Sequence, residues 1–273
     1  MTLYEAITRH TGAQSKTLIK HLAAAGIEQW GSLTKVNLMA LQDELKCTLA
    51  PSSAKTVAAT LAAFLHRFEE EDLIPYKDFP SVFHLKGDKS IKTYLTSEEL
   101  AAFENVRVRS DNEEYVRDCF VISARTGMRH SDMIQVRSEN VQGKQLTYSS
   151  QKTHIVATIP VSERIERMIE KVNQMALDLP LKTYNAIVRR LARRAGINAR
   201  VAIHKGGKDY TKEKWECLSS HSARVTFCTL LSDLGVSVTD ISHLAGHSSP
   251  LMTNGYIVRK TPVLSDNAMT FFE

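Results

Sequence analysis

Apolar residues recur at helical spacing through most of the chain, and this periodicity constrains the fold more than any other feature of the sequence. Beyond Pro51 they fall at i, i+4, i+7, i+8 and i+11, which predicts one helix with a single apolar stripe of Val57, Leu61, Phe64, Leu65 and Phe68. A second helix is predicted around Val36, Leu38, Leu41 and Leu45. The pattern from Thr17 to Ala25 predicts an earlier helix that ends at Gly26. Residues 1–75 are therefore expected to form an all-helical unit.

The periodicity breaks between Glu69 and Tyr94, where an acidic run, prolines and mixed polar residues follow one another. We interpret this stretch as a linker. It predicts two domains, over residues 1–90 and 91–273.

The second domain is predicted to be mainly α with a small β-sheet. Thr96 and Glu99 form a candidate capping box for a helix through Phe103. A largely buried helix is predicted over Glu113 to Thr126, and β-favouring segments at residues 145–149 and 154–159 predict a hairpin. Helical periodicity then returns at residues 161–172, 184–195, 221–234 and 238–245.

Composition adds a charge argument. The chain carries 35 Lys and Arg against 30 Asp and Glu, and residues 180–260 hold 13 basic and 5 acidic side chains. The positive surplus thus lies in one stretch, as expected of a surface that meets phosphates and equally of a solvated basic face.

Several classes of protein are disfavoured. Residues 1–12 lack the apolar core of a signal peptide and no run approaches a membrane span, so we expect a cytoplasmic protein without membrane contact. The four cysteines are widely spaced, which indicates neither a zinc ribbon nor a disulfide framework. His243 and His247 lie at i, i+4, but Leu244 stands where a zinc-protease motif has glutamate, so no metal site is predicted.

Several short motifs follow one another in the second half, and each alone is a weak signal. They are Arg125–Thr126–Gly127–Met128–Arg129, Lys152 in the predicted hairpin turn, His221–Ser222–Ala223–Arg224, Leu244–Ala245–Gly246–His247 and Thr253–Asn254–Gly255–Tyr256. Their order, spacing and flanking residues together resemble the tyrosine recombinase (phage integrase) family over roughly residues 94–260. Ala245 departs from the family's usual second Leu in this motif, and the departure does not affect the chemistry.

The resemblance implies a two-domain DNA clamp, with a SAM-like helical core-binding domain and a tyrosine recombinase catalytic domain with a C-terminal tail. It implies a site-specific DNA recombinase or integrase that cleaves and rejoins strands through a 3′-phosphotyrosine intermediate, without metal, ATP or another cofactor. It assigns the catalytic positions to Arg129, Lys152, His221, Arg224, His247 and Tyr256, and an acidic position to Asp132. We expect no separate arm-binding domain ahead of the helical unit.

The residue types suit that chemistry. Two guanidinium groups, on Arg129 and Arg224, would neutralise the charge on the nonbridging phosphate oxygens. His221 and His247 would add donors, with His221 the better candidate to accept the tyrosine proton. An unperturbed phenol, with a pKa of about 10, is a poor nucleophile at neutral pH, so Tyr256 requires a cationic surround. By the family's assignment, Lys152 would protonate the departing 5′ oxygen.

Double-stranded DNA is the expected partner. Arg189, Arg190, Arg193 and Arg194 lie at helical spacing, with Lys205 and Lys208 nearby, and would track phosphates; the same pattern also fits a solvated helix face. Lys16, Lys20 and Lys55 would approach the duplex from the first domain. The resemblance further implies a homotetramer on two DNA sites, with accessory DNA-bending factors as further partners.

The tail beyond Thr261 carries apolar residues near its end. We expect Met269, Phe271 and Phe272 to dock in trans on a neighbouring protomer. Deletion of residues 265–273 should then weaken tetramer assembly on DNA more than single-site binding.

Two alternatives come from other classes. A type IB topoisomerase uses similar Arg, Lys, His and Tyr chemistry but relaxes DNA as a monomer. A non-catalytic DNA-binding regulator could share the fold, although all six catalytic positions are filled.

Overall fold

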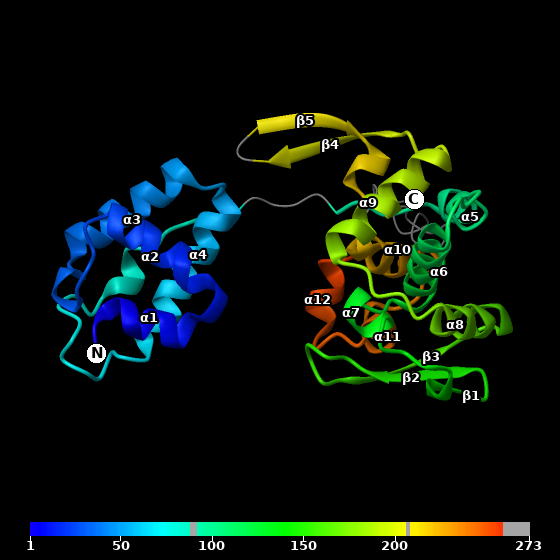
Figure 1. The fold of residues 1–273 in the computed structure, drawn as a ribbon, viewed down its shortest axis with the longest axis horizontal. Helices are drawn as coiled ribbons and strands as arrows, with labels where there is room; N and C mark the ends of the chain where they lie inside the picture. Colours follow the sequence, from blue (N-terminus) through cyan, green and yellow to red (C-terminus); the bar gives the residue numbers. More distant parts are fainter. Residues whose placement is uncertain (88–91, 206–207, 259–273) are drawn as a thin grey trace, which may run out of the picture. The chain divides into compact units, whose positions relative to one another are not determined.

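In a computed structural model, residues 1–87, 92–205 and 208–258 are described. The chain divides into two compact units, and each is considered by itself. The first comprises Met1–Ile91 together with Ala202–Tyr210, and the second comprises Lys92–Val201 together with Thr211–Glu273. Within both units the elements are mostly helical, as the sequence predicts (Figure 1).

The first unit is built on α-helices that enclose one apolar core. They are α1 (Leu3–Thr11), α2 (Ser15–Ala24), α3 (Lys35–Thr48) and α4 (Pro51–His66). Pro51 occupies the first turn of α4, where the missing N–H costs nothing. Leu61, Phe64 and Leu65 of the predicted stripe are buried. Val36 differs from the prediction, since it lies in α3 but 74% of its surface is exposed.

The predicted linker is partly wrong. Ile74, Phe79 and Val82 are buried in the core of the first unit, and a short 3-10 turn forms at Phe79–Ser81. His84 is also held there, because its backbone N–H donates to Gln42 at 2.8 Å. The segment lacks periodicity because it packs as an irregular chain and not because it is free of the core.

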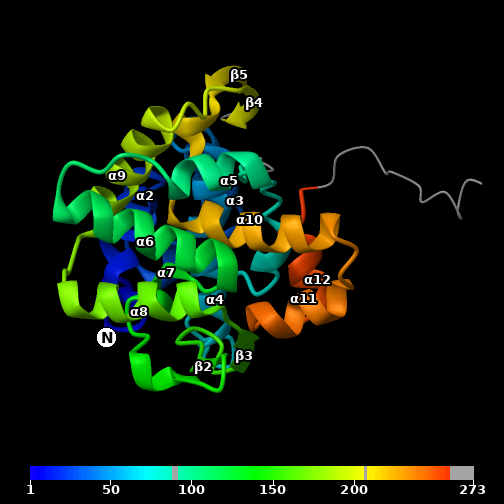
Figure 2. The same cartoon turned by 90° about the vertical axis from the view of Figure 1, so that its right-hand side faces the viewer.

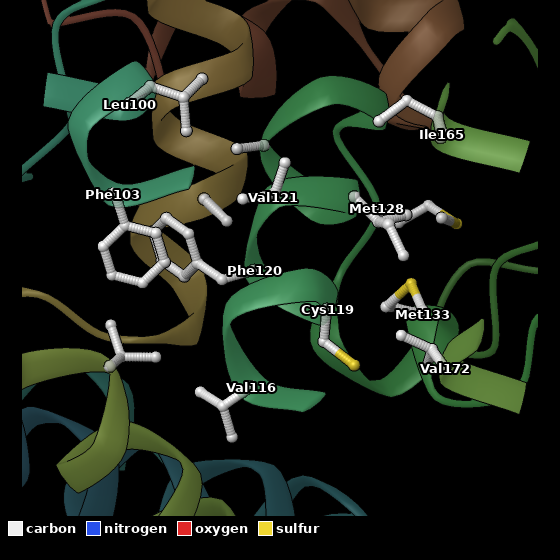
Figure 3. Close-up of a cluster of buried hydrophobic side chains, with 14 of the residues drawn as sticks. Leu100, Phe103, Val116, Cys119, Phe120, Val121, Met128, Met133, Ile165 and Val172 are labelled. Atoms are coloured by element: carbon white, nitrogen blue, oxygen red, sulfur yellow. The ribbon is translucent and has the colours of Figure 1, made fainter. Parts of the chain in front are cut away.

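The second unit is organised around helix α6. Its α-helices are α5 (Ser97–Glu104), α6 (Asp111–Thr126), α7 (His130–Met133), α8 (Glu163–Met175), α9 (Leu181–Arg194), α10 (Ser220–Asp233), α11 (Val238–Ala245) and α12 (Pro250–Asn254). Helix α6 packs against α5, α8, α9 and α10, and Figure 2 shows it flanked by α8 and α10. Its apolar side chains meet those of the neighbouring helices in one core (Figure 3).

Local signals place the ends of these helices. The predicted capping box forms, since Thr96 Oγ1 accepts from the Glu99 N–H and the Glu99 carboxylate accepts from the Thr96 N–H. Helix α6 begins after Ser110, whose side chain accepts from the Glu113 N–H, and it ends at Thr126 with Gly127 as the C-cap. The capped end of α6 therefore fixes where the backbone of Arg129, two residues after Gly127, begins.

The β-structure is small. Strands β1 (Val141–Gln142), β2 (Gln145–Ser149) and β3 (Val156–Pro160) form an antiparallel sheet in the order β1-β2-β3. Leu146 pairs with Ile159, and Tyr148 pairs with Ala157, on the buried face. The predicted hairpin is therefore confirmed. A second hairpin of β4 (Arg200–Lys205) and β5 (Lys208–Glu213) was not predicted, because its charged residues carry no apolar alternation.

Candidate active site

Arg129 lies at the start of α7, directly after the turn that ends α6. Its Nη1 donates to Ser150 Oγ at 2.8 Å and lies 3.7 Å from Asp132 Oδ2. Asp132 is buried, and its Oδ1 accepts from the backbone N–H of Gln151 at 3.0 Å. Asp132 and Ser150 therefore connect Arg129 to the β2–β3 turn, which carries Lys152.

Gly127 brings α6 and α10 into close contact. Its φ of 72° lies in the left-handed region, and a Cβ built there would meet Phe227 Cδ1 at 2.5 Å. The Gly127 carbonyl accepts from Arg224 Nη1 at 2.6 Å. Glycine is thus required both by the backbone conformation and by the approach of α10, and the same turn holds the second arginine.

Arg224 is almost fully buried, with 1% of its surface exposed. Its Nε donates to His247 Nε2 at 3.2 Å, and Nη1 donates to Gly127. Its Nη2 is buried and has no hydrogen-bond partner within the described residues. Burial and the charge of Arg129 lower the pKa of Arg224, yet a guanidinium stays charged at neutral pH. A buried cation with a free donor favours an anion beside it.

His247 acts as the acceptor for Arg224. Burial, reinforced by the charges of Arg224 and Arg129, lowers the pKa of His247 to about 3, so the ring is neutral. Since Nε2 accepts from Arg224, the proton is assigned to Nδ1, which donates to Thr253 Oγ1 at 2.8 Å. In this arrangement His247 orients Arg224, whereas the sequence suggested that it would donate to phosphate.

His221 lies in the first turn of α10, and part of its surface is open to solvent while its ring packs beside that of Tyr256. Desolvation lowers its pKa, and so do positive charges from Lys92, Arg224, Arg129 and Lys152. The unprotonated ring is therefore the favoured form at neutral pH. Such a ring, with its centroid 5.1 Å from that of Tyr256, can accept a proton.

Tyr256 follows α12 and is partly exposed. Its backbone N–H donates to the Thr253 carbonyl at 2.8 Å, and its own carbonyl accepts from Thr229 Oγ1 at 3.5 Å. The centroid of its ring lies 4.6 Å from that of His247 and 5.3 Å from the Arg224 guanidinium carbon. The phenol is thus held among the groups that the sequence motifs single out.

Lys152 is exposed in the turn between β2 and β3. The charge of Lys152 contributes to the lowered pKa of His221. Lys152 therefore lies on the same side of the unit as the cluster of Arg129, His221, Arg224, His247 and Tyr256. The turn is shaped by Ser150, whose N–H donates to the Ile155 carbonyl at 2.9 Å.

Lys92 is a residue of this cluster that the sequence motifs missed. Its Nζ lies 4.1 Å from the centroid of the Tyr256 ring and donates to the Gly255 carbonyl. Lys92 and Gly255, which this hydrogen bond joins, are 163 positions apart in the sequence. No local sequence pattern marks the lysine.

Comparisons with known proteins show the family and the fold. The profile of the phage integrase family matches residues 93–261, which is more than half of the chain. The chain belongs to the phage integrase family. The resemblance inferred from the motifs is therefore confirmed. No curated protein matches this family member significantly in sequence.

Three solved structures show the integrase fold at low identity. A lambda integrase dimer bound to a COC′ core site has a TM-score of 0.67 and 17% identity, covering 97% of this chain and 100% of that chain. The Tn1549 transposon integrase, in complex with a circular intermediate DNA, has a TM-score of 0.69 and 16% identity, covering 100% and 98%. XerH site-specific recombinase, bound to a palindromic difH substrate, has a TM-score of 0.68 and 14% identity, covering 95% and 77%. The predicted fold class is thus confirmed.

The basic residues of α9 in this integrase-family chain make internal contacts. Glu113, which is buried, accepts from Arg190 Nε at 2.9 Å and from Arg194 Nη1 at 2.7 Å. The hydrogen bond from Arg194, partly opposed by burial, is the main reason that the pKa of Glu113 falls to about 2. These two arginines therefore tie α9 to α6.

The other two arginines of α9 also have partners in the unit. Arg189 Nε donates to the Leu218 carbonyl at 3.1 Å, and the Arg193 guanidinium lies 5.3 Å from the centroid of the Trp215 ring. Contact of the four arginines with DNA stays a prediction.

The remaining predicted DNA contacts are placed as follows. Lys16, Lys20 and Lys55 are exposed on α2 and α4, and Lys208 is exposed in β5. Lys205 lies in β4, but its side chain is outside the described part. The predicted docking residues Met269, Phe271 and Phe272 also lie outside the described residues.

The described ranges hold neither a candidate metal site nor a candidate membrane span. Residues 1–87, 92–205 and 208–258 contain no group of three or more His, Cys, Asp or Glu that could hold a metal ion. Over the same part of the chain, no helix is both long and apolar enough to span a bilayer.

Proposed function

We propose that the chain is a site-specific DNA recombinase in which Tyr256 forms a covalent bond to the 3′ phosphate of a cleaved strand. The family and the fold support DNA recombination. The proposal that Tyr256 attacks a phosphate rests on one observation. The Nη2 of Arg224 is buried and unpaired among the described residues, and the guanidinium lies near Arg129 and the ring of Tyr256. An anion of the charge and size of a phosphate would supply the missing acceptor.

The reaction proceeds in two transesterifications. The Tyr256 Oη attacks phosphorus, its proton passes to His221, and the bond from phosphorus to the 5′ oxygen breaks. Lys152 donates a proton to that oxygen, which leaves as a 5′-hydroxyl. The 5′-hydroxyl of the partner strand then attacks the phosphotyrosine, and Tyr256 leaves as a phenol. One ester is exchanged for another, so neither ATP nor a metal is required for the energy balance.

The two arginines have different supports. Arg129 is held by Ser150 and Asp132, and Arg224 by His247 and Gly127. Because both guanidinium groups are fixed before the substrate binds, they need no reorganisation as charge develops on the phosphate oxygens. His247 serves this step through Arg224.

We further propose that double-stranded DNA is bound by a dimer at each site and that two such sites are brought together in a tetramer. The support is that lambda integrase is described as a dimer bound to a core site and as a tetramer bound to a Holliday junction.

Covalent trapping tests the proposal. The full chain and its Tyr256→Phe variant are incubated with nicked duplexes from the DNA that flanks the gene, with and without EDTA, and separated on denaturing gels. A protein–DNA adduct is expected with the parent chain, undiminished by EDTA, and none is expected with Tyr256→Phe. Tyr76→Phe is the matched control, since this tyrosine lies in the first unit with its hydroxyl bonded to Ser81.

Other outcomes separate the alternatives. Tight binding without any adduct would indicate a DNA-binding regulator. An adduct accompanied by relaxation of supercoiled DNA, without exchange between two sites, would indicate a type IB topoisomerase.

A further inference from the structure

Lys92 contacts the nucleophile segment at two points. Its Nζ donates to the carbonyl of Gly255, the residue before Tyr256, and lies 4.1 Å from the centroid of the Tyr256 ring. A Cβ on Gly255 would lie 3.8 Å from Lys92 Nζ, so the lysine head group packs directly on this turn. One cation therefore touches both the backbone and the ring of the segment that carries the phenol.

The lysine stands in a partly enclosed and mostly cationic environment. It is half-buried, and burial lowers the pKa of Lys92, opposed by the neighbouring Cys228 thiol. The charge of Lys92 in turn lowers the pKa values of His221 and His247. The titratable and charged groups around Lys92 and Tyr256 are His221, Arg224 and Cys228 of α10 and His247 after α11. The charge of Arg129, before α7, acts on both histidines, and the charge of Lys152, in the β2–β3 turn, acts on His221.

A cation over an aromatic face is attracted by the electrons of the ring. The attraction strengthens when the phenol becomes a phenolate, because a full negative charge then replaces a quadrupole. A cation in this position therefore stabilises the attacking form of tyrosine more than the resting form. The hydrogen bond to the Gly255 carbonyl holds the Lys92 ammonium over the Tyr256 ring, where it can stabilise that negative charge.

We infer that Lys92 is a positioning residue for Tyr256, which holds the phenol toward the arginine pair and stabilises the negative charge that develops on its oxygen as the phosphate is attacked. This inference rests on the proposed function. It differs from the role of Lys152, which would protonate the leaving oxygen, whereas Lys92 acts on the attacking one. Neither the family motifs nor the comparisons assign this role.

The test measures single-turnover cleavage by the full chain on the duplex that gives the covalent adduct. Lys92→Met should slow cleavage by about tenfold to thirtyfold, the range expected from loss of one partly desolvated cation–π contact. Lys92→Arg, which keeps the cation, should restore most of the rate. Lys92→Gln keeps a donor for Gly255 without the charge, so it should remain slow. Lys182→Met, an exposed lysine in the first turn of α9, is the matched control and should cleave at the parent rate.

The pH profile distinguishes a charge effect from a packing effect. The deficit of Lys92→Met should shrink as the pH rises toward about 10, because burial lowers the pKa of Lys92 and the parent chain then loses the charge as well. DNA affinity and the temperature of unfolding should remain at the parent values in Lys92→Gln. These two measurements exclude a loss caused by weaker binding or by misfolding.

Clear results would overturn the inference. Cleavage by Lys92→Gln at the parent rate would show that the charge is not needed, and a deficit that is constant with pH would show that the lysine acts only on structure. If Tyr256→Phe still forms the adduct, the proposed function fails. If Tyr256→Phe abolishes the adduct while Lys92→Gln is unimpaired, only the inference about Lys92 fails.

Discussion

At the residue scale, the candidate site depends on groups whose preferred states are altered by burial. His247 is neutral because it is enclosed beside Arg224, and this neutrality lets its Nε2 accept from the guanidinium. Arg224 in turn is fixed by the carbonyl of Gly127, a residue that cannot carry a side chain without meeting Phe227. A motif glycine with no chemistry of its own is therefore part of the arginine site.

Replacement of this glycine gives a prediction at the same scale. Gly127→Ala combines a left-handed φ with a contact of 2.5 Å to the Phe227 ring, so we expect a loss of about 3 kcal/mol or more in the free energy of unfolding. Gly143→Ala has a similar φ of 56° but open space around the new methyl, and should cost only about 1 kcal/mol. Urea unfolding of both variants measures the difference. Equal losses would mean that Phe227 moves aside freely.

At the element scale, the β2–β3 hairpin is tied to the arginine cluster at one end of its turn. Ser150 contacts Arg129, and Gln151 is held by Asp132, while the following Lys152 is exposed. The element therefore has a fixed base and an accessible tip. This arrangement suits a lysine that reaches the leaving oxygen only when DNA is bound.

A sulfur substitution tests that role of the hairpin. On ordinary DNA, Lys152→Met should slow cleavage by about 10²-fold to 10⁴-fold, the usual contribution of a general acid. When the bridging 5′ oxygen is replaced by sulfur, the leaving group is a thiolate whose conjugate acid has a pKa of about 8.5, so the variant should cleave nearly as fast as the parent chain. Lys144→Met, in the preceding turn, is the control. Equal loss on both substrates would assign Lys152 to DNA binding.

At the scale of the whole molecule, the positive surplus of residues 180–260 falls into two groups. Arg194 of α9 is partly buried and is held by Glu113, whereas Lys208 and Lys212 of β5 are exposed. Side chains with the same formal charge therefore have different roles. The exposed lysines can displace the counterions of DNA, whereas an arginine that is paired with a buried carboxylate stabilises the fold.

Salt titrations of DNA binding distinguish the two groups. Lys208→Gln and Lys212→Gln should each reduce the slope of log affinity against log salt by about 0.9, with no loss of stability. Arg194→Gln should leave the slope unchanged and lower the free energy of unfolding by about 1 to 3 kcal/mol, since the buried Glu113 loses an ion-pair partner. A smaller slope for Arg194→Gln would assign this arginine to the DNA surface instead.

The sequence by itself determined the helical periodicity, the capping box at Thr96, the first hairpin and the ordered motifs that mark the family. These are local patterns, and the backbone obeys them wherever the segment lies. Only the tertiary structure decided that Lys92 packs on Tyr256, that His247 serves Arg224 and that Glu113 occupies two arginines of α9. Each of these contacts joins residues far apart in the chain, and burial decides their protonation and their free donors, so no local pattern could specify them.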